Sequence, residues 1–234
     1  MRALRYALIA LVLLAALAVA GDRIALGRAE DRAASDVQRE YGLTEKPKID
    51  IKGFPFLTQV LAKEFGEVTI DMSGIEATSG TGGGAPLKLS KAVADLRDVR
   101  VIGNNWDRAR AKRAEGRVHL DYDDVSAAIP GGVVQVGYGG ADAAGNQQVK
   151  ASVEVPILGE QSATGTISVH GGDTIRMRAT NTSGLPAFVR KNLNWEWQIT
   201  DLPPGITLES VNIDKNGIDI SGGGTDVDLS DTPR

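Results

Sequence analysis

Between Lys48 and Ile75 the spacing of apolar positions changes twice, which predicts a strand, a short helix and a second strand. Ile49 and Ile51 alternate with polar residues, as in a strand with one buried face. Pro55 then fits the first turn of a helix, where its missing N–H costs nothing. The apolar residues that follow recur at helical spacing: Leu57, Val60, Leu61 and Phe65. A period of two returns after Gly66, so we expect the helix to end there.

Most of the remaining chain alternates polar and apolar residues in short runs. Such runs fall near residues 99–101, 118–122, 134–138, 149–155, 167–169, 175–177, 195–199, 218–220 and 227–229. Turn signals such as Gly139-Gly140 and Asn216-Gly217 lie between them. The pattern therefore predicts roughly ten strands with one apolar and one polar face, which is typical of antiparallel sheets.

An apolar sheet face of this size is wider than the predicted helices can cover. Ten strands at a spacing of ~4.8 Å span about 48 Å, whereas a helix is only ~10 Å across. The sequence predicts no more than two or three helices. We therefore expect the sheet to curl on itself, to fold into a sandwich filled by its own side chains, or to leave an apolar groove for a ligand.

The N-terminus has the features of an export signal. Arg2 and Arg5 precede an apolar run from Tyr6 to Ala20, and Ala18-Val19-Ala20 offers a small-x-small cleavage site. The run is short for a membrane span, which takes ~20 residues. However, helix-forming residues continue through 21–40, so a retained anchor is also compatible with the sequence. Because the basic residues come first, we expect the body of the protein outside the cytoplasm.

Composition excludes several classes of protein. The formal net charge of −4 argues against nucleic-acid binding driven by bulk charge. The chain has no cysteine, which excludes disulfides, thiolate metal sites and a cysteine nucleophile. With only His119 and His170, a histidine metal centre is poorly provided for. The motifs of serine hydrolases, zinc proteases and phosphate-binding loops are missing, so we expect neither a cofactor nor a metal.

An acidic cluster follows His119 and is the main candidate for chemistry. Strand alternation would place Asp121 and Asp123 on the polar face with His119, opposite Tyr122. A calcium site or a general base could be built from these carboxylates and Asp124, but the spacing of an EF-hand is missing. A solvated strand end is the interpretation that the pattern favours.

The window 97–117 holds seven basic and three acidic side chains in a chain that is acidic as a whole. One interpretation is a solvated loop. The other is a rim that meets anionic headgroups or the membrane surface, where each Lys or Arg contributes ~1 kcal/mol. Trp106 would suit such an interfacial position. This second interpretation assigns headgroup or membrane-surface contacts to Arg108, Arg110, Lys112 and Arg113.

Four segments carry a resemblance to a known family: GFPFLTQVL at 53–61, EVTI at 67–70, VHLDYDDVSAAI at 118–129 and LPPGI at 202–206. They are similar to the actinobacterial LmeA-like phospholipid-binding proteins. The resemblance implies an extracytoplasmic protein that binds phospholipids, in a family with a member linked to lipoglycan maturation in the mycobacterial envelope. It also implies a curved sheet wrapped around a helix, similar to tubular lipid-binding folds, and no catalytic residues.

Pattern and resemblance together predict an α+β, mainly β fold, with a curved antiparallel sheet wrapped around one or two helices. We expect residues 1–20 to be a signal peptide or membrane anchor and 21–234 to be a single lipid-binding domain. The expected partners are a phospholipid, taken to be anionic, and the membrane surface, without nucleic acid. The residues expected to line an apolar groove for acyl chains are Phe54, Phe56, Leu57, Val60, Leu61, Phe65, Val134, Val136 and Tyr138.

Two alternatives to a lipid-binding protein remain open at this point. One is a non-enzymatic scaffold for lipoglycan or wall assembly that holds no lipid. The other is a lipid or glycan hydrolase that uses Asp121 or Asp123, although the expected protein is not an enzyme. The sequence does not name the lipid or the oligomeric state.

Overall fold

The computed structural model describes residues 2–77, 87–103, 108–129, 134–155, 159–180, 182, 194–199, 202 and 204–229. Within them, the helices are α1 (Arg2–Glu40), α2 (Phe56–Ala62) and α3 (Tyr122–Ala128). The strands are β1 (Lys48–Lys52), β2 (Glu64–Ala77), β3 (Leu87–Ile102), β4 (Arg108–Leu120), β5 (Val134–Ala141), β6 (Gln147–Val155), β7 (Gly159–His170), β8 (Thr174–Ala179), β9 (Trp195–Gln198), β10 (Ile206–Ile213) and β11 (Ile218–Asp228). The predicted α+β, mainly β class is confirmed.

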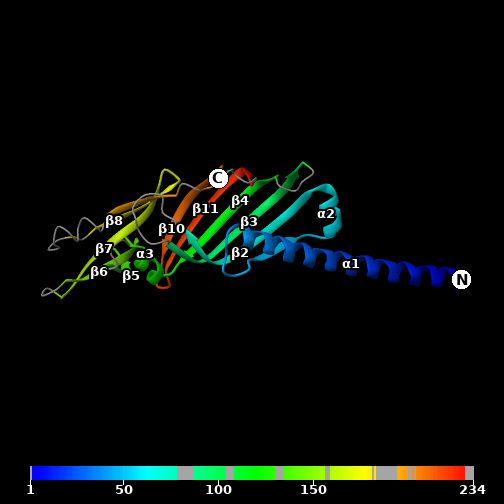
Figure 1. Cartoon of the computed structure of the whole chain (residues 1–234), viewed down its shortest axis with the longest axis horizontal. Helices are drawn as coiled ribbons and strands as arrows, with labels where there is room; N and C mark the ends of the chain where they lie inside the picture. The colour runs from blue at the N-terminus through cyan, green and yellow to red at the C-terminus, as the bar shows by residue number, and fades with distance from the viewer. Residues whose placement is uncertain are drawn as a thin grey trace.

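The strands divide between two antiparallel sheets. A six-stranded sheet has the order β1-β2-β3-β4-β11-β10, and a five-stranded sheet has the order β5-β6-β7-β8-β9. The two sheets follow one another along the longest axis of the molecule, and β10 lies where they meet (Figure 1). A backbone hydrogen bond from Leu208 N–H of β10 to the carbonyl oxygen of Gly172, in the turn between β7 and β8, joins the two sheets (2.7 Å).

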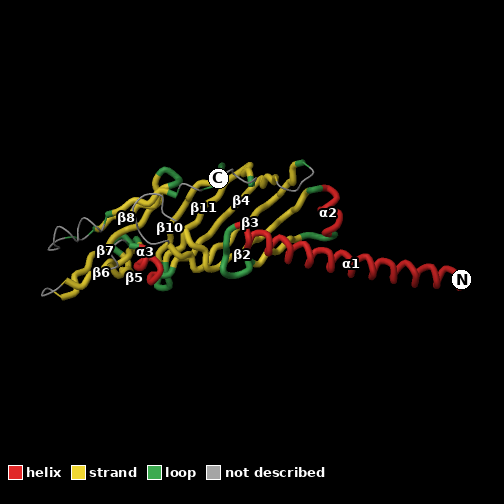
Figure 2. The backbone as a smooth tube through the Cα atoms, viewed as in Figure 1, coloured by secondary structure: helices red, strands yellow, loops and turns green. Residues whose placement is uncertain are grey.

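Helix α1 runs without a break through the predicted cleavage site and projects beyond the sheets at one end (Figure 2). It is long and apolar enough to cross a membrane, a property that a signal sequence shares. Its second half packs on the edge strand β1, where Ala34 is buried. The Glu30 carboxylate accepts a hydrogen bond from the backbone N–H of Ile51 at 2.9 Å, so an edge-strand donor is satisfied.

Helix α2 ends three residues earlier than the sequence predicts. Lys63, with φ of 57°, caps its C-terminus in the left-handed conformation, and Gly66 lies within β2. The Lys63 carbonyl oxygen accepts a hydrogen bond from Val101 N–H at 3.0 Å. Phe65 pairs with Val99 across the sheet, so strand pairing takes over before the glycine is reached.

The predicted strand through Tyr122 is wrong, because β4 ends at Leu120 and α3 begins at Tyr122. Asp121 occupies the N-cap position, and Asp123 and Asp124 lie in the first turn. Carboxylates are favoured at this end of a helix because their negative charge is attracted to the positive end of the helix dipole. The acidic cluster is therefore also a helix-start signal.

Two glycines of the six-stranded sheet differ sharply in the space around them. A Cβ added to Gly224 would lie 1.9 Å from the Gly205 carbonyl oxygen, which is impossible without a backbone shift. A Cβ added to Gly116 would meet nothing nearer than the Gly222 carbonyl oxygen at 3.9 Å. Strand β11 thus needs a glycine at 224, whereas β4 leaves open space at 116.

We expect Gly224→Ala to lower the free energy of unfolding by about 1–3 kcal/mol, the usual cost of overpacking. Gly116→Ala should change it by no more than ~0.5 kcal/mol, since the added methyl group meets no obstacle. Thermal or urea unfolding of the two variants beside the wild type checks this. Equal destabilisation by both would contradict the packing described here.

Candidate functional site

One face of the six-stranded sheet is apolar and the other is polar. In β4, Ala114 and Leu120 are buried, whereas Glu115 and Arg117 between them are exposed. The same alternation continues in the neighbouring strands through the antiparallel register. The apolar face is the candidate site, because burying it is the largest demand that this sheet makes.

Side chains become small across the middle of this face. The register aligns Ile70 with Ala94, Ala94 with Gly116, and Gly116 with Gly222. The rows on either side add further small residues. We call the six positions the central patch: Ala92, Ala94, Ala114, Gly116, Gly222 and Gly224. The side chains at the centre of the apolar face therefore extend less far from the sheet than those around them.

Larger apolar residues that are only half-buried border the central patch: Ile70, Met72, Leu96, Ile206, Leu208 and Val211. In a filled core, side chains of this size at the middle of a sheet would be fully covered. Their partial exposure means that the described residues do not completely cover the middle of the apolar face.

Helices α1 and α2 cover one end of the apolar face. Phe56 of α2 and Phe65 of β2 are buried there, with ring centroids 6.4 Å apart. Val99 and Ala111 complete the buried cluster, and α1 packs against it through residues such as Leu26. We call this cluster the helical end.

The five-stranded sheet covers the other end of the apolar face. Ile218 and Leu120 of the six-stranded sheet are buried there against Val134, Val136 and Val149 of the five-stranded sheet. The partly buried Tyr138 packs against the same cluster. We call this cluster the sheet end, and the central patch lies between the two ends.

The nine apolar residues predicted to line a groove occupy three environments. Three of them lie in the helical end: Phe56, Val60 and Phe65. Three lie in the sheet end: Val134, Val136 and Tyr138. The remaining three are exposed to solvent: Phe54, Leu57 and Leu61. The structure thus places the first six at opposite ends of one apolar face and does not bring all nine together.

The four basic residues assigned to headgroup contacts are all exposed: Arg108, Arg110, Lys112 and Arg113. They belong to β4, and Arg110 alternates with the buried Ala111, so it faces away from the apolar face. Its guanidinium lies 3.5 Å from the Asp228 carboxylate. These residues share an end of the sheet with α2, whereas Trp106 lies outside the described residues.

The central patch is the part of the site that sequence reasoning missed. Its signal is the occurrence of Ala and Gly at the apolar positions of otherwise regular strands, as in Ala92-Val93-Ala94 and Ala114-Glu115-Gly116. Such residues add little to an apolar pattern, so they mark a strand weakly. Their role in the site becomes visible only when the register of the six-stranded sheet shows that they lie next to one another.

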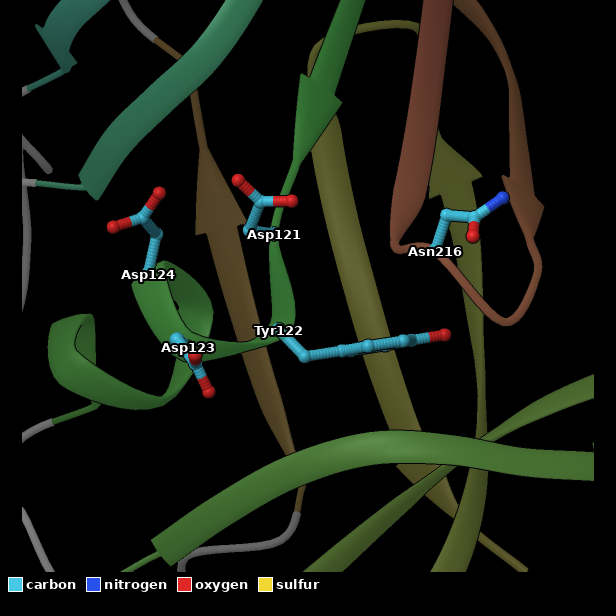
Figure 3. Close-up of a pocket in the computed structure, with 5 residues that line it drawn as sticks. All are labelled: Asp121, Tyr122, Asp123, Asp124 and Asn216. Carbon is cyan, nitrogen blue, oxygen red and sulfur yellow. The ribbon is translucent and has the colours of Figure 1, made fainter.

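The acidic cluster lines a polar cavity of about 450 Å³ together with Tyr122 and Asn216 (Figure 3). Ser90 Oγ lies 2.5 Å from a carboxylate oxygen of Asp121 and 3.1 Å from one of Asp124, which ties the start of α3 to β3. Burial raises the pKa of Tyr122 to about 12. Among the described residues, no group of three or more His, Cys, Asp or Glu is arranged to hold a metal ion.

His119 joins this cluster to the last strand. Its Nδ1 lies 2.7 Å from Oδ1 of Asp219, and its Nε2 lies 3.6 Å from Oδ1 of Asp121. The hydrogen bond to Asp219 is the main cause that raises the pKa of His119 above its ordinary value, against the opposing effect of burial. The His119 side chain thus lies between β4, β11 and the start of α3.

The fold and the face define a class: a mainly β protein whose main sheet presents an apolar surface that the rest of the described chain covers only in part. Surfaces of this kind mark sites for apolar ligands or partners. A sequence profile of the family described as LmeA-like phospholipid-binding matches residues 20–223, so the chain belongs to this family. Comparisons with curated proteins and with solved structures gave no match.

Because the pKa of His119 is raised in the folded state, its stabilising contribution is complete below the unfolded value of 6.5 and is lost as pH rises through the folded value. We expect the free energy of unfolding to fall between about pH 6 and about pH 8.5, and His119→Gln to remove most of this dependence. Urea unfolding at both pH values checks it. An equal pH dependence in His119→Gln and His170→Gln would contradict this assignment.

Proposed function

We propose that this chain is an extracytoplasmic, non-enzymatic phospholipid-binding protein of the cell envelope, which holds acyl chains on its apolar face over the central patch. Membership of a phospholipid-binding family supports the ligand class. The observation that carries the proposal is the partial exposure of large apolar residues around the central patch, such as Ile70 and Leu208. In this proposal residues 21–234 act as one domain, and the N-terminal apolar segment directs export or anchors it.

The dimensions of the face suit an acyl chain. Along β4, the apolar face extends about 30 Å from Ala111 to Leu120 at ~3.4 Å per residue, and its middle part, from Ala114 to Val118, extends about 14 Å. One leaflet of a bilayer contributes only about half of a hydrocarbon core that is ~30 Å thick. A chain that fills one leaflet can therefore lie along the apolar face within its length.

The energetics explain why small side chains at the centre of the face would favour binding of an acyl chain. Each CH₂ removed from water contributes ~0.8 kcal/mol, but a lipid in a bilayer has already gained this. Binding therefore requires the protein to surround the chain as completely as neighbouring lipids do. A chain lying on Gly116 and Ala94, with Ile70 and Leu208 rising beside it, contacts apolar atoms on three sides.

The basic residues of β4 are proposed to interact with anionic headgroups at the end of the sheet that also carries α2. Arg108 and Lys112 are exposed there, and each nearby cation contributes ~1 kcal/mol at an anionic surface. Because they lie on the polar side of β4, this contact would involve lipids of the membrane surface or a headgroup that reaches around the sheet edge.

We expect Gly116→Leu to reduce phospholipid binding at least about tenfold, since the added side chain would occupy the central patch and the loss of a few CH₂ contacts of ~0.8 kcal/mol each suffices. Native mass spectrometry of the purified full chain, with titration of phosphatidylglycerol, measures this. The matched control is Glu115→Leu, which adds the same side chain on the polar face.

Full phospholipid binding by Gly116→Leu would show that acyl chains do not use the central patch. A wild-type protein that carries no phospholipid and takes up none from vesicles would overturn the proposed function, and would favour a scaffold without lipid. Unfolding temperatures of both variants establish that the comparison concerns folded proteins.

A second expectation concerns charge. Arg108→Gln combined with Lys112→Gln should reduce the preference for phosphatidylglycerol over phosphatidylcholine, by a factor that shrinks as salt screens the surface. The control is Lys150→Gln with Arg178→Gln, which removes the same charge from the five-stranded sheet. Vesicle competition assays at low and high salt measure the preference, and an equal loss in both double variants would contradict the assignment.

A further inference from the structure

Three large apolar side chains of the elbow formed by residues 53–62 are exposed to solvent. Phe54 is 62% exposed, Leu57 45% and Leu61 84%. Leu57 and Leu61 are one helical turn apart, so they lie on the same side of α2. The other side of α2 packs on the domain, where Phe56 is buried in the helical end. The elbow thus has one face for its own core and a second apolar face turned outward.

The elbow is attached to α1 at Asp22 and Arg23. The Asp22 carboxylate accepts a hydrogen bond from Leu57 N–H at 2.8 Å, in place of the side-chain cap that Pro55 does not provide. The Arg23 guanidinium lies 5.0 Å from the centre of the Phe54 ring, within the range of a cation–π contact.

Asp22 and Arg23 lie where the apolar part of α1 ends. Residues from Ala3 to Gly21 are exposed throughout, and Asp22 is the first described residue of α1 that is buried. At ~1.5 Å per residue this exposed part is about 28 Å long, close to the ~30 Å thickness of a bilayer core. If α1 spans the membrane, Asp22 and the elbow lie at its surface.

We infer that the outward face of the elbow, formed by Phe54, Leu57 and Leu61, inserts into the interfacial region of the bilayer beside α1. Figure 1 shows α2 at the end of the domain from which α1 projects. Aromatic and aliphatic side chains favour this region, and Arg23 next to Phe54 suits its anionic headgroups. This inference concerns where the domain meets the membrane and goes beyond the lipid held on the apolar face.

The chain contains no cysteine, which allows a direct test with single labels. The full chain carrying Leu61→Cys or Leu57→Cys is labelled with a fluorophore and reconstituted in vesicles of phosphatidylglycerol and phosphatidylcholine. The matched control is Tyr41→Cys, an exposed site at the far end of α1. Quenching by spin-labelled phosphatidylcholine reports contact with lipid, and quenching by iodide reports contact with water.

The expected result is several-fold stronger lipid quenching and weaker iodide quenching at positions 57 and 61 than at position 41. Equal quenching at all three positions would overturn the inference. Protection from iodide without lipid quenching would also overturn it, and would assign the elbow to a protein partner or a second copy of the chain.

A second set of variants separates this inference from the proposed function. In a Gly116→Leu background the central patch is blocked, so lipid quenching at Leu61→Cys must persist if the bilayer is its source. Loss of quenching in that background would show that a lipid bound to the domain, and not the bilayer, contacts the elbow. Lipid quenching at positions 57 and 61 in a protein that takes up no phospholipid would instead leave the inference standing while the proposed function falls.

Discussion

The structure depends on one constraint, which is that a six-stranded sheet with a single apolar face must keep that face out of water. No one element of the described chain does so alone. Two helices cover one end and a second sheet covers the other, and both covers are built from residues distant in sequence. The middle is left to Ala and Gly, whose small side chains expose little apolar area of their own. The face is therefore divided into two cores at its ends and a centre whose larger bordering residues are only partly covered.

In the proposed function, this division separates folding from ligand binding. The buried residues of the two ends, such as Phe65 and Ile218, pack against protein on all sides and do not require a ligand. The centre contributes less to stability, because Ala and Gly bury few CH₂ groups. If the proposed function holds, such a protein would release and accept an apolar ligand without losing its fold. The polar cluster of Asp121, Ser90 and His119 lies outside this arrangement and ties β3, β4 and β11 together at the sheet end.

Much of the fold follows from local pattern, and the remainder depends on pairing between distant segments. The strand at Lys48–Lys52 is confirmed, because its alternation is clear and Pro47 marks its start. Alternation assigns faces but not neighbours, so the position of β11 between β4 and β10 could not be predicted. The start of α3 was missed because alternation through Tyr122 competes with the capping signal of Asp121. Leu57 and Leu61 carry the strongest apolar signal of the elbow, and that signal cannot distinguish a core from an outward face.

The unbroken α1 also fixes how the domain can move. Within the half of α1 that packs on the domain, Asp22 is hydrogen-bonded to α2 and Glu30 is hydrogen-bonded to β1. No flexible linker therefore separates the N-terminal segment from the sheets. Under the proposal that α1 stays in the membrane, a domain mounted on such a stalk would not tumble, and its main remaining freedom would be rotation about the helix axis. Any change in the tilt of α1 would be carried through the sheet as a rigid lever. The five-stranded sheet, at the far end of the lever, would then move toward or away from the membrane, whereas rotation about the helix axis would keep its height nearly constant and so set the distance at which a partner could meet it.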